Sequence, residues 1–99
     1  MENAVNIRSV AQVLSPVFRQ HGVSRAVLFG SVAKGTNTNS SDLDILVDSN
    51  LKGLRFIGLL EDVKQAVNME VDLFDVSHIK SGSLVEREIE KTGVVIYEE

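Results

Sequence analysis

The chain has 99 residues and a formal net charge of −4, which favours one domain with one modest core over residues 1–99. Its 43% hydrophobic and 24% charged residues are ordinary for a soluble globular protein, and Gly and Pro are not enriched, which excludes collagen-like and disordered classes. The absence of Cys excludes disulfides and thiolate metal sites, and it is consistent with the cytoplasmic location that we expect.

Charge and hydropathy also limit the partners. No apolar run is long enough to span a bilayer, and the N-terminus lacks the order of a signal peptide, so no membrane partner is expected. The ten Lys and Arg residues are scattered, which disfavours direct nucleic-acid binding. A small anionic substrate that is carried by a metal ion remains compatible, and the sequence leaves a homo-oligomer open.

The first half of the chain predicts a helix, a buried strand and a loop. Residues 7–20 form an amphipathic helix that ends near Gly22, with Pro16 as a point where it could kink or divide. Its apolar side chains at helical spacing are Val10, Val13, Leu14, Val17 and Phe18. Residues 26–29 read as a buried strand, and residues 30–41 as a loop with a short helix around 31–34.

The second half alternates strands with helices. Strands are expected at 43–47, 70–76 and 94–97, and helices at 54–67 and 82–91. The inward side chains of the two helices are expected to be Leu54, Ile57, Leu60, Val63 and Val67 in the first, and Leu84, Val85 and Ile89 in the second. This alternation favours an α/β (α+β) sheet with helices packed against it.

Two acidic residues begin the strand at 43–47. Asp42 and Asp44 are separated by one residue, so both carboxylates point to the same face of the strand. Like charges side by side repel, and a divalent cation removes that conflict. Oxygen ligands on a rigid strand suit Mg²⁺, which proteins usually hold with one or two carboxylates plus substrate phosphates.

Asp72 repeats this pattern in the next strand. It lies between Val71 and Leu73, where a structural role calls for an apolar or paired side chain. If the two strands are neighbours, Asp42, Asp44 and Asp72 can converge. Two Mg²⁺ ions held there could bind the attacking and leaving oxygens of a phosphoryl displacement.

Gly30 and Ser31 directly follow the first strand and are candidates for binding phosphate. Gly lets the backbone approach a ligand closely, and a helix beginning at Ser31 would direct N–H groups at a triphosphate. Gly35 relieves crowding at the next turn. Lys34 faces either the phosphates or the solvent.

Each of these residues also has a plainer interpretation. Asp42 and Asp44 could cap a helix or lie in a solvated turn, Asp72 could be a surface residue, and Ser31 could cap a helix and still bind phosphate. For the remaining polar residues we favour structural or solvated roles: His21, His78, Asp48, Asp62, Asp75 and the charged run 86–91. Packing is the default for Tyr97.

The order of these features carries a resemblance. The segment GSVAKGTNTNSSDLDILV resembles the signature of the DNA polymerase beta-like nucleotidyltransferase superfamily. The short length, the later VDLF and the closing GVVIYE make the whole chain similar to its minimal nucleotidyltransferase (MNT) subfamily. The resemblance implies a nucleotidyltransferase fold with a mixed sheet of three to four strands.

The resemblance also implies roles for these residues. Gly30 and Ser31 bind the triphosphate, and Asp42, Asp44 and Asp72 are the catalytic metal ligands, with Asp72 favouring deprotonation of an acceptor hydroxyl. Lys34 stands where many members have Arg. The implied reaction moves a nucleoside monophosphate, with ATP as the expected donor and two Mg²⁺ ions, and positioning and charge neutralisation supply the catalysis.

Three functions compete. The MNT resemblance implies an antitoxin that attaches AMP to a tyrosine hydroxyl of a HEPN-domain toxin. A non-catalytic binding module that neutralises or regulates a partner by contact is the second, although the intact carboxylates argue against it. Transfer to a small molecule is the third, and it is disfavoured because such enzymes carry an added acceptor domain.

Overall fold

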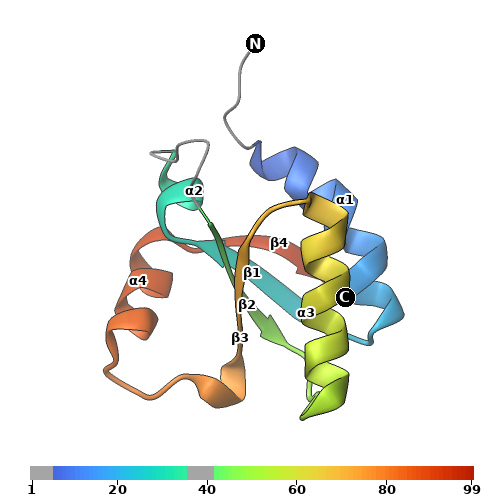
Figure 1. Ribbon diagram of the computed structural model, residues 1–99. Coiled ribbons are helices and arrows are strands. Elements are labelled where there is room, and N and C mark those ends of the chain that lie inside the picture. The colour runs from blue at the N-terminus through green and yellow to red at the C-terminus, as the bar shows by residue number, and fades with distance from the viewer. Residues whose placement is uncertain (1–5, 36–41) are drawn as a thin grey trace.

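The computed structural model describes residues 6–35 and 42–99, in which a four-stranded mixed sheet has helices on both faces (Figure 1). The elements are α1 Ile7–Gln20, β1 Arg25–Phe29, α2 Ser31–Lys34, β2 Leu43–Asp48, α3 Leu54–Val67, β3 Val71–Asp75, the 3₁₀ turn η1 Val76–His78, α4 Leu84–Thr92 and β4 Val94–Glu98. The expected fold class is confirmed, and the observed bounds differ from the expected ones by at most two residues.

The strand order β3-β2-β1-β4 places the two strands that carry the acidic residues next to each other. β1 pairs antiparallel with both β2 and β4, whereas β2 and β3 are parallel. A parallel pair needs a crossover connection, and α3 supplies it. In the resulting register, Asp44 stands opposite Asp72.

The main core lies between the sheet and the two long helices, α1 and α3, which lie side by side on one face (Figure 1). Leu14 and Phe18 of α1 are fully buried there. Val13, which we expected to face inward, is 43% exposed because it lies at the edge of the apolar stripe. Pro16 is exposed, and α1 continues through it as one helix.

The inward face of α3 differs from the expected one. Leu54 is 85% exposed and Ile57 is 51% exposed, whereas Leu59 and Val63 are fully buried. At about 100° per residue, Leu54 lies on nearly the opposite side of the helix from Val63. The expectation was wrong for Leu54 because Leu59 and Val63 define the buried side of α3, and Leu54 does not lie on it.

The helix α4 lies on the other face of the sheet from α1 and α3 (Figure 1). Val85 and Ile89 are partly buried as expected, but Leu84 is 81% exposed because it precedes the inward stripe by one residue. That stripe continues through Glu88 and Thr92, which are also partly buried. In the part of the chain that the structure describes, no helix has the length and apolar character needed to cross a membrane.

Candidate active site

Asp44 and Asp72 lie side by side on the sheet face that is turned away from α1 and α3, called here the α4 face. Leu43, Ile45 and Val47 fill the core, so alternation along β2 turns Asp44 to the opposite side. Asp72 is its direct partner on β3. The expected convergence of these two carboxylates is confirmed by this register.

The two carboxyl groups strongly affect each other. The pKa of Asp44 is raised from its ordinary 3.8 to about 6, first by burial and then by the charge of Asp72 and a hydrogen bond between the two groups. Asp42 and Glu88 add smaller charge effects in the same direction. Three carboxylates, those of Asp72, Asp42 and Glu88, therefore contribute to the electrostatic environment of Asp44.

Asp42 immediately precedes β2 and is exposed to solvent. Its position two residues before Asp44 gives it the same side of the strand, and its effect on the pKa of Asp44 places it close enough to act on that group. Ser41 and the preceding loop residues back to Thr36, which belong to the signature segment, lie outside the described residues.

Gly30 brings the backbone of the candidate phosphate loop against Asp44. It has φ +84°, and a Cβ added at this position would overlap the Asp44 carboxylate. No other residue type fits both this left-handed backbone and this close contact. The expected short helix is confirmed as α2, one turn that begins at Ser31 and ends at Gly35, where φ is +79°.

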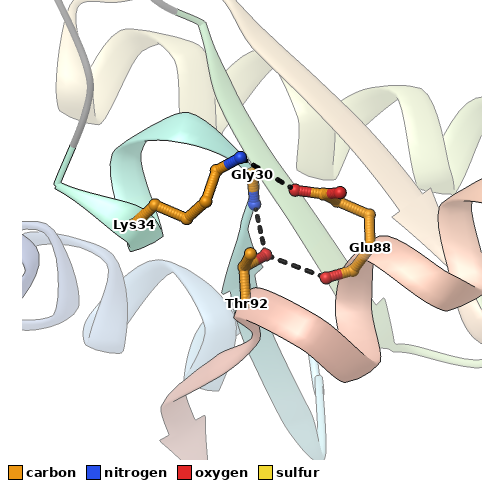
Figure 2. A network of polar contacts seen from close by, with 4 residues as sticks. All are labelled: Gly30, Lys34, Glu88 and Thr92. Carbon is orange, nitrogen blue, oxygen red and sulfur yellow. Dashed lines mark hydrogen bonds and ion pairs between the residues drawn. The ribbon is translucent and has the colours of Figure 1, made fainter.

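The end of α4 contacts the same loop through a polar network (Figure 2). The Gly30 N–H donates to Thr92 Oγ1 at 2.9 Å, and the Thr92 hydroxyl donates to the Glu88 carbonyl oxygen at 2.8 Å. Lys34 Nζ lies 3.7 Å from a Glu88 carboxylate oxygen. Lys34 therefore faces a neighbouring carboxylate, and its contact with phosphate stays a prediction.

Sequence reasoning missed both Glu88 and Thr92. The sequence analysis placed Glu88 in a solvated charge run, and the predicted helix 82–91 ended before Thr92. The signal that could have found them is helical spacing, because residues 88 and 92 fall on the same stripe as Val85 and Ile89.

The donor chemistry of the site fits a divalent cation. When two carboxylates lie side by side without a cation, protonation of one of them is favoured, which is consistent with the raised pKa of Asp44. A divalent cation bound between them would favour the ionised form of both. Within residues 6–35 and 42–99, no group of three or more His, Cys, Asp or Glu side chains is placed to hold an ion together. The metal roles of Asp42, Asp44 and Asp72 therefore stay predictions.

Asp75 and Asp62 have specific structural partners. Asp75 is 2% exposed and accepts hydrogen bonds from the backbone N–H and the hydroxyl of both Ser49 and Ser77. Burial alone would raise its pKa, but these hydrogen bonds outweigh that effect and lower the pKa to about 2. His78 Nδ1 accepts the Asp75 N–H, and Asp62 lies 2.7 Å from His21 Nε2.

Comparison with known proteins supports the same chemistry. The model of the family described as polymerase beta, nucleotidyltransferase matches residues 12–99. A protein of Methanocaldococcus jannaschii that is provisionally named a protein adenylyltransferase is 31% identical over 77 residues, which cover 76% of this chain and 83% of that protein.

Two solved structures have a similar fold. A chain in a crystal structure of a toxin–antitoxin with AMP-PNP is 24% identical with a TM-score of 0.72, over 90% of this chain and 73% of that one. A chain in the complex of tri-AMPylated Shewanella oneidensis HEPN toxin with MNT antitoxin is 20% identical with a TM-score of 0.68. The match covers 95% of this chain and 74% of that one. Because the family model covers nearly the whole chain, and because the acidic strand pair and the Gly-Ser loop lie together as the signature requires, this chain belongs to the polymerase beta nucleotidyltransferase family.

Proposed function

We propose that this chain is a protein adenylyltransferase, which transfers AMP from ATP to a hydroxyl group of a partner protein and requires Mg²⁺. The observation that carries the proposal is the contact between three segments: the Gly30 backbone lies against Asp44, and Asp44 stands opposite Asp72. The relative that is named for protein adenylyl transfer and the similar structure with AMP-PNP support ATP as the donor.

The charges of the site define what each residue does in this proposal. Asp42, Asp44 and Asp72 would hold Mg²⁺, which would offset their repulsion and bind the triphosphate. Gly30 and Ser31 would place the phosphates beside these carboxylates, and Lys34 would add a positive charge at the edge of the loop.

The transfer step follows from this arrangement. The acceptor oxygen forms a bond to the α-phosphorus, the bond from that phosphorus to the bridging oxygen breaks, and pyrophosphate leaves. Asp72 is exposed whereas Asp44 is partly buried, so Asp72 is the carboxylate we assign to receive the proton of the acceptor hydroxyl.

A HEPN-domain toxin is the acceptor that we propose. A similar structure pairs an MNT antitoxin with an AMPylated HEPN toxin, which supports this choice. The chain would then act in the cytoplasm as a single nucleotidyltransferase domain over residues 1–99 and neutralise the toxin by modifying it.

The test is transfer of label from α-³²P-ATP to a HEPN-domain protein encoded next to this chain, with and without Mg²⁺. Asp44→Asn and Asp72→Asn should each reduce transfer at least about a hundredfold, because each removes a charge that the site needs. Asp48→Asn is the matched control, because Asp48 is an exposed residue at the other end of the same strand. Equal transfer by wild type and both site variants would contradict the proposal.

The same experiment separates the alternative functions. A complex that forms and neutralises the partner without any label transfer would favour the binding module. Label that moves only to small molecules would favour a small-molecule transferase. Either outcome would contradict the proposal.

A further inference from the structure

The C-terminal end of α4 is held tightly against β1 next to the candidate phosphate loop. A Cβ added at Gly93 would lie 2.5 Å from the Ile89 carbonyl oxygen and 3.0 Å from Val27 Cγ1, so only Gly permits this close approach. Thr92, the residue before it, therefore has a fixed position beside Gly30.

The Thr92 hydroxyl uses both of its hydrogen-bonding functions in this position (Figure 2). It accepts the Gly30 N–H at 2.9 Å and donates its own proton to the Glu88 carbonyl oxygen at 2.8 Å. Gly30 is buried, so this N–H would carry a desolvation cost if it lost its partner. The bond joins a residue of the last helix to a loop 62 positions earlier in the chain.

A second, weaker contact joins the same two segments. Lys34 Nζ at the end of α2 lies 3.7 Å from the Glu88 carboxylate, with both side chains at least one-third exposed. Exposed ion pairs stabilise little, so this contact adds charge balance more than free energy. The Thr92 hydrogen bond is therefore the stronger of the two contacts by which α4 holds the loop.

We propose that Thr92 is a positioning residue, which holds the Gly30–Ser31 backbone against Asp44 in the conformation that receives the triphosphate. This inference rests on the proposed function. Glycine has access to many backbone conformations, and Gly30 adopts one with φ +84°, in which the loop lies against Asp44. A bond to its N–H from outside the loop holds the peptide group that enters Gly30 in place before a nucleotide binds.

The experiment compares Thr92→Val, which keeps the shape but removes the hydroxyl, with Thr92→Ser, which keeps the hydroxyl. Amide hydrogen exchange of Gly30, followed by NMR, should be faster in Thr92→Val than in wild type. Calorimetry with Mg²⁺ and AMP-PNP should show about fivefold weaker binding in Thr92→Val, the effect of one lost hydrogen bond. Thr92→Ser should restore both values.

Ser83→Ala is the matched control for the stability of α4. Ser83 Oγ caps the other end of α4 by accepting the Glu86 N–H at 3.1 Å, far from Gly30 along the helix. This variant should lower the melting temperature and leave AMP-PNP binding unchanged.

The outcomes separate this inference from the proposed function. If wild type binds AMP-PNP and Thr92→Val binds it equally well, or if Ser83→Ala weakens binding as much as Thr92→Val, the positioning role is overturned. If wild type itself binds no nucleotide in the presence of Mg²⁺, the proposed function fails and the positioning role fails with it.

Discussion

Asp44 and Asp72 are direct partners in the parallel register of β2 and β3, on the sheet face turned away from the main core. Phe29, the partner of Asp44 on the other side, is 4% exposed, so one flank of Asp44 is apolar and the other is acidic. Both surroundings disfavour the ionised form of Asp44, which explains why its pKa rises to about 6.

The first prediction concerns the stability of the metal-free chain. Because the pKa of Asp44 rises from 3.8 to about 6 on folding, its contribution to stability is complete below pH 3.8 and is lost as the pH rises through about 6. At pH 7, Asp44→Asn should therefore have a free energy of unfolding higher than that of wild type by on the order of 1 kcal/mol after solvent screening. It should unfold at a correspondingly higher urea concentration. The two proteins should be about equally stable at pH 4.

The measurement is urea unfolding in EDTA at several pH values, followed by the same series with excess Mg²⁺. Added Mg²⁺ should stabilise wild type and leave Asp44→Asn nearly unchanged. A stability difference that does not vary between pH 4 and pH 7 would contradict the raised pKa of Asp44.

The second prediction ranks the neighbours of Asp44. Asp72→Asn should lower the pKa of the Asp44 carboxyl more than Glu88→Gln does, because Asp72 has the larger effect and also forms a hydrogen bond with Asp44. NMR titration of the Asp44 carboxyl carbon would measure both values. Equal decreases in the two variants would show that the carboxylates are arranged differently around Asp44.

The third prediction concerns the close contact at Gly30. Gly30→Ala adds a Cβ that overlaps the Asp44 carboxylate, whereas Gly22→Ala adds one with open space around it, and both glycines have positive φ. Gly22→Ala should cost about 1 kcal/mol for the backbone conformation alone. Gly30→Ala should cost clearly more and should weaken binding of Mg²⁺ and AMP-PNP about tenfold or more, because a small displacement of the loop separates it from the carboxylates.

Urea unfolding and calorimetry test this pair. If Gly30→Ala and Gly22→Ala lose the same free energy of unfolding and bind AMP-PNP alike, the contact between Gly30 and Asp44 has no consequence.

The fourth prediction concerns the buried Asp75. One carboxylate oxygen accepts two hydrogen bonds from Ser49, and the other accepts two from Ser77. Asp75→Asn replaces one acceptor with an NH₂ donor that faces a backbone N–H, so it should cost about 2 to 3 kcal/mol. The exposed Asp48→Asn should change stability by less than about 0.5 kcal/mol.

The pH dependence of this variant has the opposite sign to that of Asp44. The pKa of Asp75 is lowered to about 2, so its contribution is present above pH 3.8 and is lost as the pH falls toward 2. The difference between wild type and Asp75→Asn in urea unfolding should therefore shrink from pH 7 to pH 2.5. A difference that stays constant over this range would contradict the hydrogen-bonded carboxylate.

The sequence was sufficient to predict the helices, the strands and the strands that carry Asp44 and Asp72, because these depend on local periodicity. Alternation along residues 43–47 fixes which side Asp44 takes, and the buried Leu43 and Ile45 confirm it. The register between β2 and β3 depends on non-local pairing, so the direct opposition of Asp44 and Asp72 required the structure.

The errors concern polar residues with distant partners and apolar helix residues outside the buried stripes, namely Val13, Leu54, Ile57 and Leu84. Leu54 and Leu84 are first residues of their helices, where an apolar side chain can still extend past the core. Thr92 was missed because its partner, Gly30, lies far away in sequence. Helical spacing places Thr92 on the inward stripe of α4, but it does not identify the residue that Thr92 contacts.

Because α3 connects β2 to β3, the site can form only late in folding. Asp44 and Asp72 meet only when β3 has been added parallel to β2, a step that requires α3 to be in place, and Thr92 reaches Gly30 only after α4 has docked. A fragment that contains the whole Gly-Ser and Asp-x-Asp signature but stops before β3 would have the right residues and no site. Nucleotide binding by this chain should therefore disappear together with the cooperative unfolding of the sheet, so it can serve as a probe of the native state.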